Sequence, residues 1–259
     1  MDQTEADQLF HDNLNQFDLV CISLKSRPDR QARSKELFSE LGILDRVHWW
    51  IVEKHPQGGM YGCFESHWLV WNASEFKRPY LCVFEDDLQM LPLSKERFYR
   101  SLNYAQEYLP SRFDILNLEP GQGYVNTQVA PELYSGGFLH LGCYIISRDS
   151  IPDVAPKVRK WFGIDVDTAL YNNSRMGAIL PKVFTQGTND SDNGGGFREI
   201  NFPLEQIFSQ LVSLKNFSPL TGWIALQLAQ GLSIYYLYTQ SKHIEFQDRR
   251  LKENPERQK

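Results

Sequence analysis

Short apolar runs alternate with longer amphipathic stretches through the first half of the chain. Four of the runs are rich in β-branched or aromatic residues and predict strands: DLVCISL (18–24), RVHWWIV (46–52), YLCVF (80–84) and FDILNLE (113–119). Three stretches between or after them have helical length and spacing: 31–43, 60–76 and 93–109. Strand alternating with helix predicts an α/β fold with a mostly parallel sheet and helices on both faces.

The second half of the chain has a less regular pattern. Residues 132–151 are β-rich with several glycines, 152–162 predict a helix, and 178–186 predict a last strand. Residues 187–197 are rich in Gly, Asn and Asp and predict a loop. From Pro203 the pattern is helical to the end, which predicts a helical C-terminal extension.

These elements predict one domain with additions at both ends. We expect a polar N-terminal segment over 1–17, a main α/β domain over 18–200, and a helical elaboration of the same domain over 201–259. A chain of 259 residues is long enough to bury the core of one large α/β domain. Its net charge of −5 argues against a nucleic-acid partner held by a basic surface.

Compartment and membrane contact are inferred from three features. The N-terminus is acidic and polar, without the charged and then apolar pattern of a signal sequence. Residues 220–238 form the most apolar late window but contain too many polar residues for a transmembrane span, so only peripheral membrane contact stays open. The four cysteines share no metal-like spacing, and we expect them to be reduced in a cytoplasmic protein rather than in a secretory lumen.

Three consecutive acids follow the third predicted strand. Glu85, Asp86 and Asp87 stand where ligands bind in open parallel sheets, at the carboxyl end of a strand. Adjacent carboxylates repel one another, and a hard divalent ion such as Mg²⁺ or Mn²⁺ relieves that repulsion. The alternative is a solvated acidic turn in which Asp87 caps a helix.

Two further segments carry candidate chemistry. Arg27 and Arg30 follow the first strand, where they suit the oxygens of a diphosphate or are simply surface arginines. Asp165 and Asp167 precede an apolar run, and either is a second metal ligand, a general base or an N-cap. His67, on the aromatic-rich helix, is a packing residue or a ligand, and the local sequence leaves both open.

Several segments together resemble glycosyltransferase family 25, the lipopolysaccharide-biosynthesis and collagen-galactosyltransferase group. They are ISLKSRPDRQARSKELFSELGI, GCFESHWLVW and LCVFEDDL, followed more weakly by GGFLHLGCYIIS, DVDTALY and SDN. The resemblance spans about residues 18–192. Ser23 stands where the family usually has Asn, and Lys25-Ser26 replaces its more common Asp-Arg pair.

The resemblance implies a GT-A-type, Rossmann-like mixed sheet flanked by helices, and an inverting transfer of a hexose, usually galactose, from a UDP-sugar. It implies a Mn²⁺ or Mg²⁺ cofactor and a hydroxyl acceptor on a glycan, a lipid-linked saccharide or a glycoprotein. The metal ligands would be Asp87, Asp86 and Glu85, and the general base Asp167, with Asp165 second. The nucleotide pocket would contain Leu24, Arg27, Arg30, Ser66, His67, Glu85 and Asp86.

Two other functions stay open from the sequence. One is a metal-dependent nucleotidyltransferase that activates a sugar phosphate, although the loop LKSRPDR lacks the glycines such an enzyme would need. The other is a catalytically silent carbohydrate-binding protein, because fold and motif do not prove turnover. The sequence leaves open which hexose is moved, the acceptor and the oligomeric state.

Overall fold

The structure is a computed structural model that describes residues 13–187. The described residues form an eight-stranded mixed sheet with the order β2-β1-β3-β8-β5-β9-β7-β6. Its strands are β1 (Phe17–Leu24), β2 (Val47–Val52), β3 (Tyr80–Glu85), β5 (Ile115–Asn117), β6 (Gly123–Ala130), β7 (Leu133–Phe138), β8 (Cys143–Ser147) and β9 (Met176–Ile179). The helices are α2 (Pro28–Leu41), α3 (Gly59–Asn72), α4 (Ser94–Tyr108), α5 (Ile151–Arg159) and α6 (Val166–Asn173). This arrangement confirms the predicted α/β class, a mixed sheet flanked by helices. The expectation of a mostly parallel sheet is wrong: three of the seven strand pairings in this sheet are parallel, because β8 inserts antiparallel between β3 and β5, and β7 pairs antiparallel with both β6 and β9.

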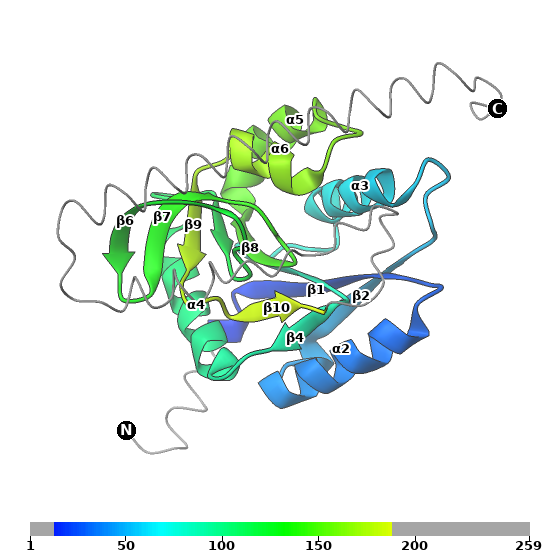
Figure 1. Cartoon of the computed structure of the whole chain (residues 1–259), viewed down its shortest axis with the longest axis horizontal. Coiled ribbons are helices and arrows are strands. Elements are labelled where there is room, and N and C mark those ends of the chain that lie inside the picture. Colours follow the sequence, from blue (N-terminus) through cyan, green and yellow to red (C-terminus); the bar gives the residue numbers. More distant parts are fainter. Residues whose placement is uncertain (1–12, 188–259) are drawn as a thin grey trace. The chain divides into compact units, whose positions relative to one another are not determined.

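Each strand sends alternate side chains to two separate apolar layers. In β3, Cys82 and Phe84 join one layer, and Leu81 and Val83 join the other. Residues of α2 and α4 pack into the first layer, and residues of α3, α5 and α6 pack into the second. Figure 1 shows α3, α5 and α6 on one side of the sheet and α2 on the other. The helices therefore cover both faces, as the alternation of strand and helix predicts.

Strand direction places several carboxyl ends at one edge of the sheet. β1 is parallel to β2 and β3, while β8 lies between β3 and β5 and is antiparallel to both. The amino end of β8 consequently lies between the carboxyl ends of β3 and β5. The Glu85 N–H donates to the carbonyl of Gly142 and the Leu118 N–H to that of Cys143, at 2.7 and 2.9 Å. Side chains just after β3 and β5 are thus near neighbours.

The prediction of a single strand over 178–186 is wrong. This segment contains the end of β9 and a separate strand, β10 (Phe184–Gln186), and Pro181 between them has no N–H to donate to a ladder. β10 pairs antiparallel with β4 (Leu88–Met90) in a second, two-stranded sheet, which the sequence pattern did not indicate. The predicted loop over 187–197, apart from its first residue, lies outside the described part of the chain.

Residues 1–12 and 188–259 lie outside the part of the chain that the structure describes. The predicted helical elaboration over 201–259, its apolar window at 220–238 and most of the N-terminal segment lie outside residues 13–187. Within that range, no helix has the length and apolar character needed to span a membrane. The predicted domain boundary at residue 200 stays a prediction.

Candidate active site

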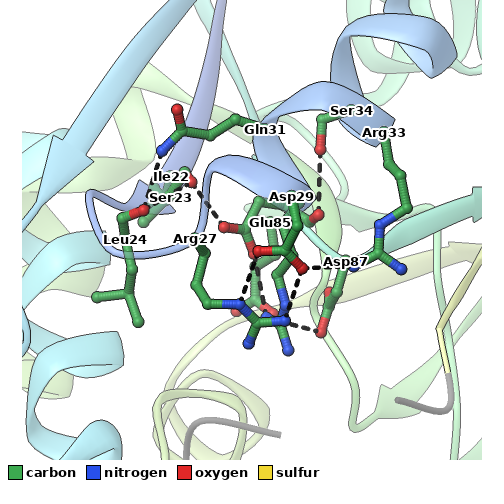
Figure 2. A network of polar contacts seen from close by, with 12 residues as sticks. Ile22, Ser23, Leu24, Arg27, Asp29, Gln31, Arg33, Ser34, Glu85 and Asp87 are labelled. Carbon is green, nitrogen blue, oxygen red and sulfur yellow. Dashed lines mark hydrogen bonds and ion pairs between the residues drawn. The ribbon is translucent and has the colours of Figure 1, made fainter. Parts of the chain in front are cut away.

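Asp86 is held between the ends of β1 and β3. Its Oδ2 accepts a hydrogen bond of 2.6 Å from the Ser23 hydroxyl, and its Oδ1 lies 3.1 Å from Nη1 of Arg30. The Ser34 hydroxyl donates to the Asp86 carbonyl at 3.1 Å. Figure 2 shows Ser23 approaching from β1, Ser34 from α2 and Asp87 from the turn after β3. Both carboxylate oxygens of Asp86 are engaged, so within this arrangement the residue orients Arg30 and the turn.

Asp87 follows in the turn and has one oxygen without a hydrogen bond. Its Oδ2 lies 3.6 Å from Nη1 of Arg30, whereas its Oδ1 is buried and has no hydrogen-bond partner among residues 13–187. Burial and the charge of Glu85 raise the pKa of Asp87 to about 7, although Arg30 acts in the opposite direction. No helix begins here, because β4 follows directly, so the alternative of an N-cap at Asp87 is wrong.

Glu119 is a site residue that the sequence reasoning missed. It follows β5 by two residues and is only 1% exposed, and its Oε2 has no hydrogen-bond partner in the described part of the chain. Its Oε1 lies 3.8 Å from Nζ of Lys182. Burial raises the pKa of Glu119 to about 8, opposed by Lys182 and assisted by Glu85 and Asp87. The available signal was an acid directly after an apolar strand, which is the pattern that singled out Glu85.

Glu85 connects this pair of acids to helix α3. Its Oε1 lies 3.2 Å from Nε2 of His67 and 3.7 Å from Sγ of Cys63. Both α3 side chains point to the same oxygen, because residues four apart share one face of a helix. Burial, then the charge of Glu85, raises the pKa of Cys63 well above its ordinary value, so the thiol keeps its proton and donates to the carboxylate.

His67 continues this contact into the core through a directed chain of hydrogen bonds. The Trp71 indole N–H donates to the Tyr144 hydroxyl at 2.8 Å, and that hydroxyl lies 2.8 Å from Nδ1 of His67. An indole N–H can only donate, so the Tyr144 proton is available for Nδ1, and Nε2–H then donates to Glu85. In this neutral tautomer, the side-chain polar atoms of Trp71, Tyr144 and His67 all have hydrogen-bond partners. His67 is therefore both a packing residue and a partner of the acid after β3.

Asp165 and Asp167 approach the same acids from the start of α6. Asp165 is the N-cap residue of α6, and Asp167 lies in its first turn. Burial raises the pKa of both carboxyl groups, although the Asp165 side chain is exposed. Charge repulsion from Glu85 adds to the rise in both, and Glu119 adds to it in Asp167. The structure therefore gathers acids from three separate segments.

The other predicted nucleotide-pocket residues make local contacts. Arg27 Nε lies 3.1 Å from Asp29 Oδ1, and this contact lowers the pKa of Asp29 to about 2. The Leu24 carbonyl accepts from the Gln31 amide at 2.9 Å, which closes the loop between β1 and α2. Ser66 donates to the carbonyl of Gly62 one turn earlier in α3. Arg27 and Leu24 line the end of β1, and Ser66 is buried within α3.

The acids are chemically suited to a hard divalent ion. Asp87 and Glu119 each have a buried oxygen without a hydrogen bond, and the charge of Glu85 acts on both of them and on the acids of α6. Without a cation, burial and mutual repulsion hold several of these groups in the protonated form near neutral pH. Carboxylate oxygens are the ligands that Mg²⁺ and Mn²⁺ prefer, so the residue types suit such an ion, although within residues 13–187 only Cys63, His67 and Glu85 bring three ligand atoms within 4.8 Å of one another.

Comparisons with known proteins give only distant likenesses. No protein-family model and no curated protein matches this sequence. A glycosyltransferase involved in the glycosylation of the major capsid of PBCV-1 is similar over 75% of this chain and 98% of its own, at 10% identity and a TM-score of 0.44. S. aureus TarS 1-349 in complex with UDP-GlcNAc is similar over 68% of this chain and 60% of its own, at 8% identity and a TM-score of 0.39.

A third likeness comes from another class of transferase. Mannose-1-phosphate geranyltransferase from Thermus thermophilus is similar over 64% of this chain and 74% of its own, at 10% identity and a TM-score of 0.39. At such identities and TM-scores, the similarities assign the chain to no family. The function must therefore be argued from the site itself.

Proposed function

We propose that this chain is an inverting glycosyltransferase that moves a hexose, galactose or glucose, from a UDP-sugar to a hydroxyl group of a glycan or glycoconjugate. One observation supports it most: carboxylates from the ends of β3 and β5 and from the start of α6 gather at the carboxyl edge of the sheet, and two of their buried oxygens lack hydrogen bonds. The sequence resemblance to glycosyltransferase family 25 points to Glu85, Asp87, Asp165 and Asp167 among these acids, but not to Glu119.

The chain's own residues divide the work of donor binding. Asp86 holds the Arg30 guanidinium at the edge of the site, where it can contact diphosphate oxygens. Asp87, Glu85 and Glu119 would hold Mn²⁺ or Mg²⁺, and such an ion would stabilise the negative charge of a departing UDP. The contact of 3.2 Å between Nε2 of His67 and Oε1 of Glu85 holds the Glu85 carboxylate in place, and the Tyr144 hydroxyl in turn holds His67.

Asp167 is our proposed general base, with Asp165 second. Its pKa is raised by burial, Asp165 and Glu85, and a carboxylate with a raised pKa is a stronger base once it is ionised. It would take the proton from the acceptor hydroxyl, or from water in the absence of an acceptor, as the oxygen attacks the anomeric carbon opposite UDP. Positioning of the two reactants would supply much of the remaining rate increase.

A donor screen tests the proposal. Purified protein is incubated with a panel of UDP-sugars, with Mn²⁺, with Mg²⁺ or with EDTA, and the release of UDP is measured. We expect release from one or two UDP-hexoses, dependent on the metal and lost in Asp87→Ala. Release of pyrophosphate from UTP and a sugar phosphate would instead identify a nucleotidyltransferase. Saccharide binding without any turnover of nucleotide would identify a silent carbohydrate-binding protein.

The setting of this activity is also proposed. UDP-sugars are abundant in the cytoplasm, and the described cysteines are all free, which agrees with a reducing compartment. The acceptor would be a glycan, a lipid-linked saccharide or a glycoprotein, and a lipid-linked acceptor would require peripheral contact with a membrane. Activity in soluble and membrane fractions with each acceptor class separates these cases.

A further inference from the structure

We infer that Cys63, His67 and Glu85 form a binding site for a thiophilic divalent metal ion such as Zn²⁺, which shares Glu85 with the proposed hard-cation ligands but does not include Asp87 or Glu119. Cys63 and His67 lie four residues apart on α3 and face the end of β3, where Glu85 stands. One ligand atom from each of the three residues lies within 4.8 Å of the other two.

The distances already approach those of a tetrahedral zinc site. Bond lengths of about 2.0–2.3 Å to nitrogen, oxygen and sulfur place ligand atoms roughly 3.3–3.6 Å apart around a tetrahedral ion. Glu85 Oε1 lies 3.2 Å from Nε2 of His67 and 3.7 Å from Sγ of Cys63. A shift of the Cys63 side chain, which is only partly buried, would complete the three-ligand arrangement.

The metal would replace two protons that now occupy this space. In the metal-free protein, the Cys63 S–H and the His67 Nε2–H both donate to the same oxygen of Glu85. Loss of the Cys63 proton to solvent and transfer of the His67 proton from Nε2 to Nδ1 leave a thiolate, a neutral imidazole with a free Nε2 and a carboxylate, a ligand set that selects Zn²⁺ over Mg²⁺. Nδ1–H of His67 would then donate to the Tyr144 oxygen, which supplies the outer hydrogen bond that metal-bound histidines usually have, and the Tyr144 hydroxyl would no longer donate to His67.

The site has an adjacent source for a fourth ligand. The charges of Asp165 and Asp167 act on Cys63, and we expect one of their carboxylates, or a water molecule, to supply the fourth ligand. Glu85 belongs both to this site and to the acids proposed to hold Mn²⁺. If the proposed function holds, Zn²⁺ bound at this site would inhibit Mn²⁺-dependent turnover of the UDP-sugar, because both ions need Glu85. Cys63→Ser would weaken this inhibition by Zn²⁺.

Cobalt titration tests the metal site without any activity measurement. Co²⁺ is added to the reduced, metal-free full-length protein, and the thiolate-to-cobalt charge-transfer absorption in the near ultraviolet is followed. We expect one equivalent of Co²⁺ to produce this band and Zn²⁺ to abolish it by displacement. A folded wild-type protein that shows no such band would overturn the proposal.

Two variants make the test specific. Cys63→Ser should lose the band, and Cys82→Ser, which alters a buried thiol in β3 away from the site, should keep it. Circular dichroism confirms that each variant is folded, and Glu85→Gln provides a second variant that should weaken Co²⁺ binding at least tenfold. A band that persists in Cys63→Ser would assign the metal to another cysteine. If these spectra appear but no UDP-sugar is turned over, the metal site stands and the proposed function fails.

Discussion

The Ser23 hydroxyl lies 2.6 Å from Oδ2 of Asp86, and this hydrogen bond joins the ends of two neighbouring parallel strands. Asp86 and its second partner Arg30 are each 7% exposed. Ser23→Ala leaves one oxygen of a buried carboxylate without its donor, and we expect a loss of about 1–3 kcal/mol in the free energy of unfolding. Asp86→Ala removes the closer carboxylate partner of the buried Arg30 and leaves Asp87 at 3.6 Å, so we expect a loss of up to about 3–5 kcal/mol.

Urea denaturation of the two variants measures both losses. Ser26→Ala is the matched control, because Ser26 is exposed in the loop after β1 and should change stability little. Equal stability of Ser23→Ala and Ser26→Ala would show that the bond between β1 and β3 contributes nothing. The position of Arg30 would then have to be explained without the Ser23–Asp86 hydrogen bond.

Stability should depend on pH through the site acids. The pKa values of Asp87 and Glu119 are raised to about 7 and about 8, whereas unfolded carboxyl groups titrate near pH 4. The folded state then binds more protons than the unfolded state between these values, so stability falls as pH rises from about 4 to about 8. Each group contributes at most about 1.4 kcal/mol per pH unit. Mn²⁺ should offset the loss, and more strongly at pH 8 than at pH 5.

Thermal unfolding between pH 5 and pH 8 follows this effect. Asp87→Asn places a neutral amide where the protonated acid stands, and its stability should fall less steeply with pH than that of the wild type. Asp29→Asn is the control, because the low pKa of exposed Asp29, about 2, keeps its charge constant over this range. An identical pH slope in Asp87→Asn and the wild type would contradict the raised pKa.

Asp167→Asn should separate donor binding from the chemical step. The variant keeps the size of the side chain but cannot accept a proton, so UDP release should fall on the order of 10²–10⁴-fold while UDP binding stays near the wild-type value. Steady-state UDP release and calorimetric titration with UDP measure the two quantities. If Asp167→Asn releases UDP at the wild-type rate and Asp165→Asn does not, the base is Asp165.

Tyr144→Phe should disturb the tautomer of His67. The variant leaves the Trp71 N–H and Nδ1 of His67 without their partner, at a cost of about 1–3 kcal/mol in unfolding free energy. In the wild type, ¹⁵N NMR should show the metal-free His67 protonated at Nε2, as the hydrogen bonds from Trp71 to Tyr144 and from Tyr144 to His67 require. Tyr124→Phe is the control, because Tyr124 is 45% exposed on the hairpin of β6 and β7. A wild-type His67 protonated at Nδ1 would contradict the direction of the chain.

Much of the sheet could be predicted from the sequence because its strands are short apolar runs with clear ends. The runs at 18–24 and 80–84 correspond to β1 and β3, because buried parallel strands are apolar on both faces. The run at 46–52 corresponds to β2, a partly exposed strand at the edge of the sheet. The insertion of β8 between β3 and β5 was not predicted. Pairing between distant segments depends on packing of the whole sheet, and an apolar run has the same appearance in either direction.

The candidate site was predictable only in part for the same reason. The three acids after β3 stand out by their adjacency, whereas Glu119 is a single acid whose place beside them depends on β8. The engagement of both Asp86 oxygens depends on Ser23 and Arg30, which are 63 and 56 residues away in the sequence. Local pattern identifies a carboxylate, but only its partners in space determine whether an oxygen is available for a ligand.

Binding of Mn²⁺ in the presence of UDP tests the role of the acid cluster most directly. The electron paramagnetic resonance signal of free Mn²⁺ is recorded as wild-type protein, Asp87→Asn or Asp29→Asn is added with UDP. We expect the wild type and Asp29→Asn to remove one Mn²⁺ per chain from solution, and Asp87→Asn to bind it at least tenfold more weakly. Equal Mn²⁺ binding by Asp87→Asn and the wild type would show that Asp87 does not hold the ion.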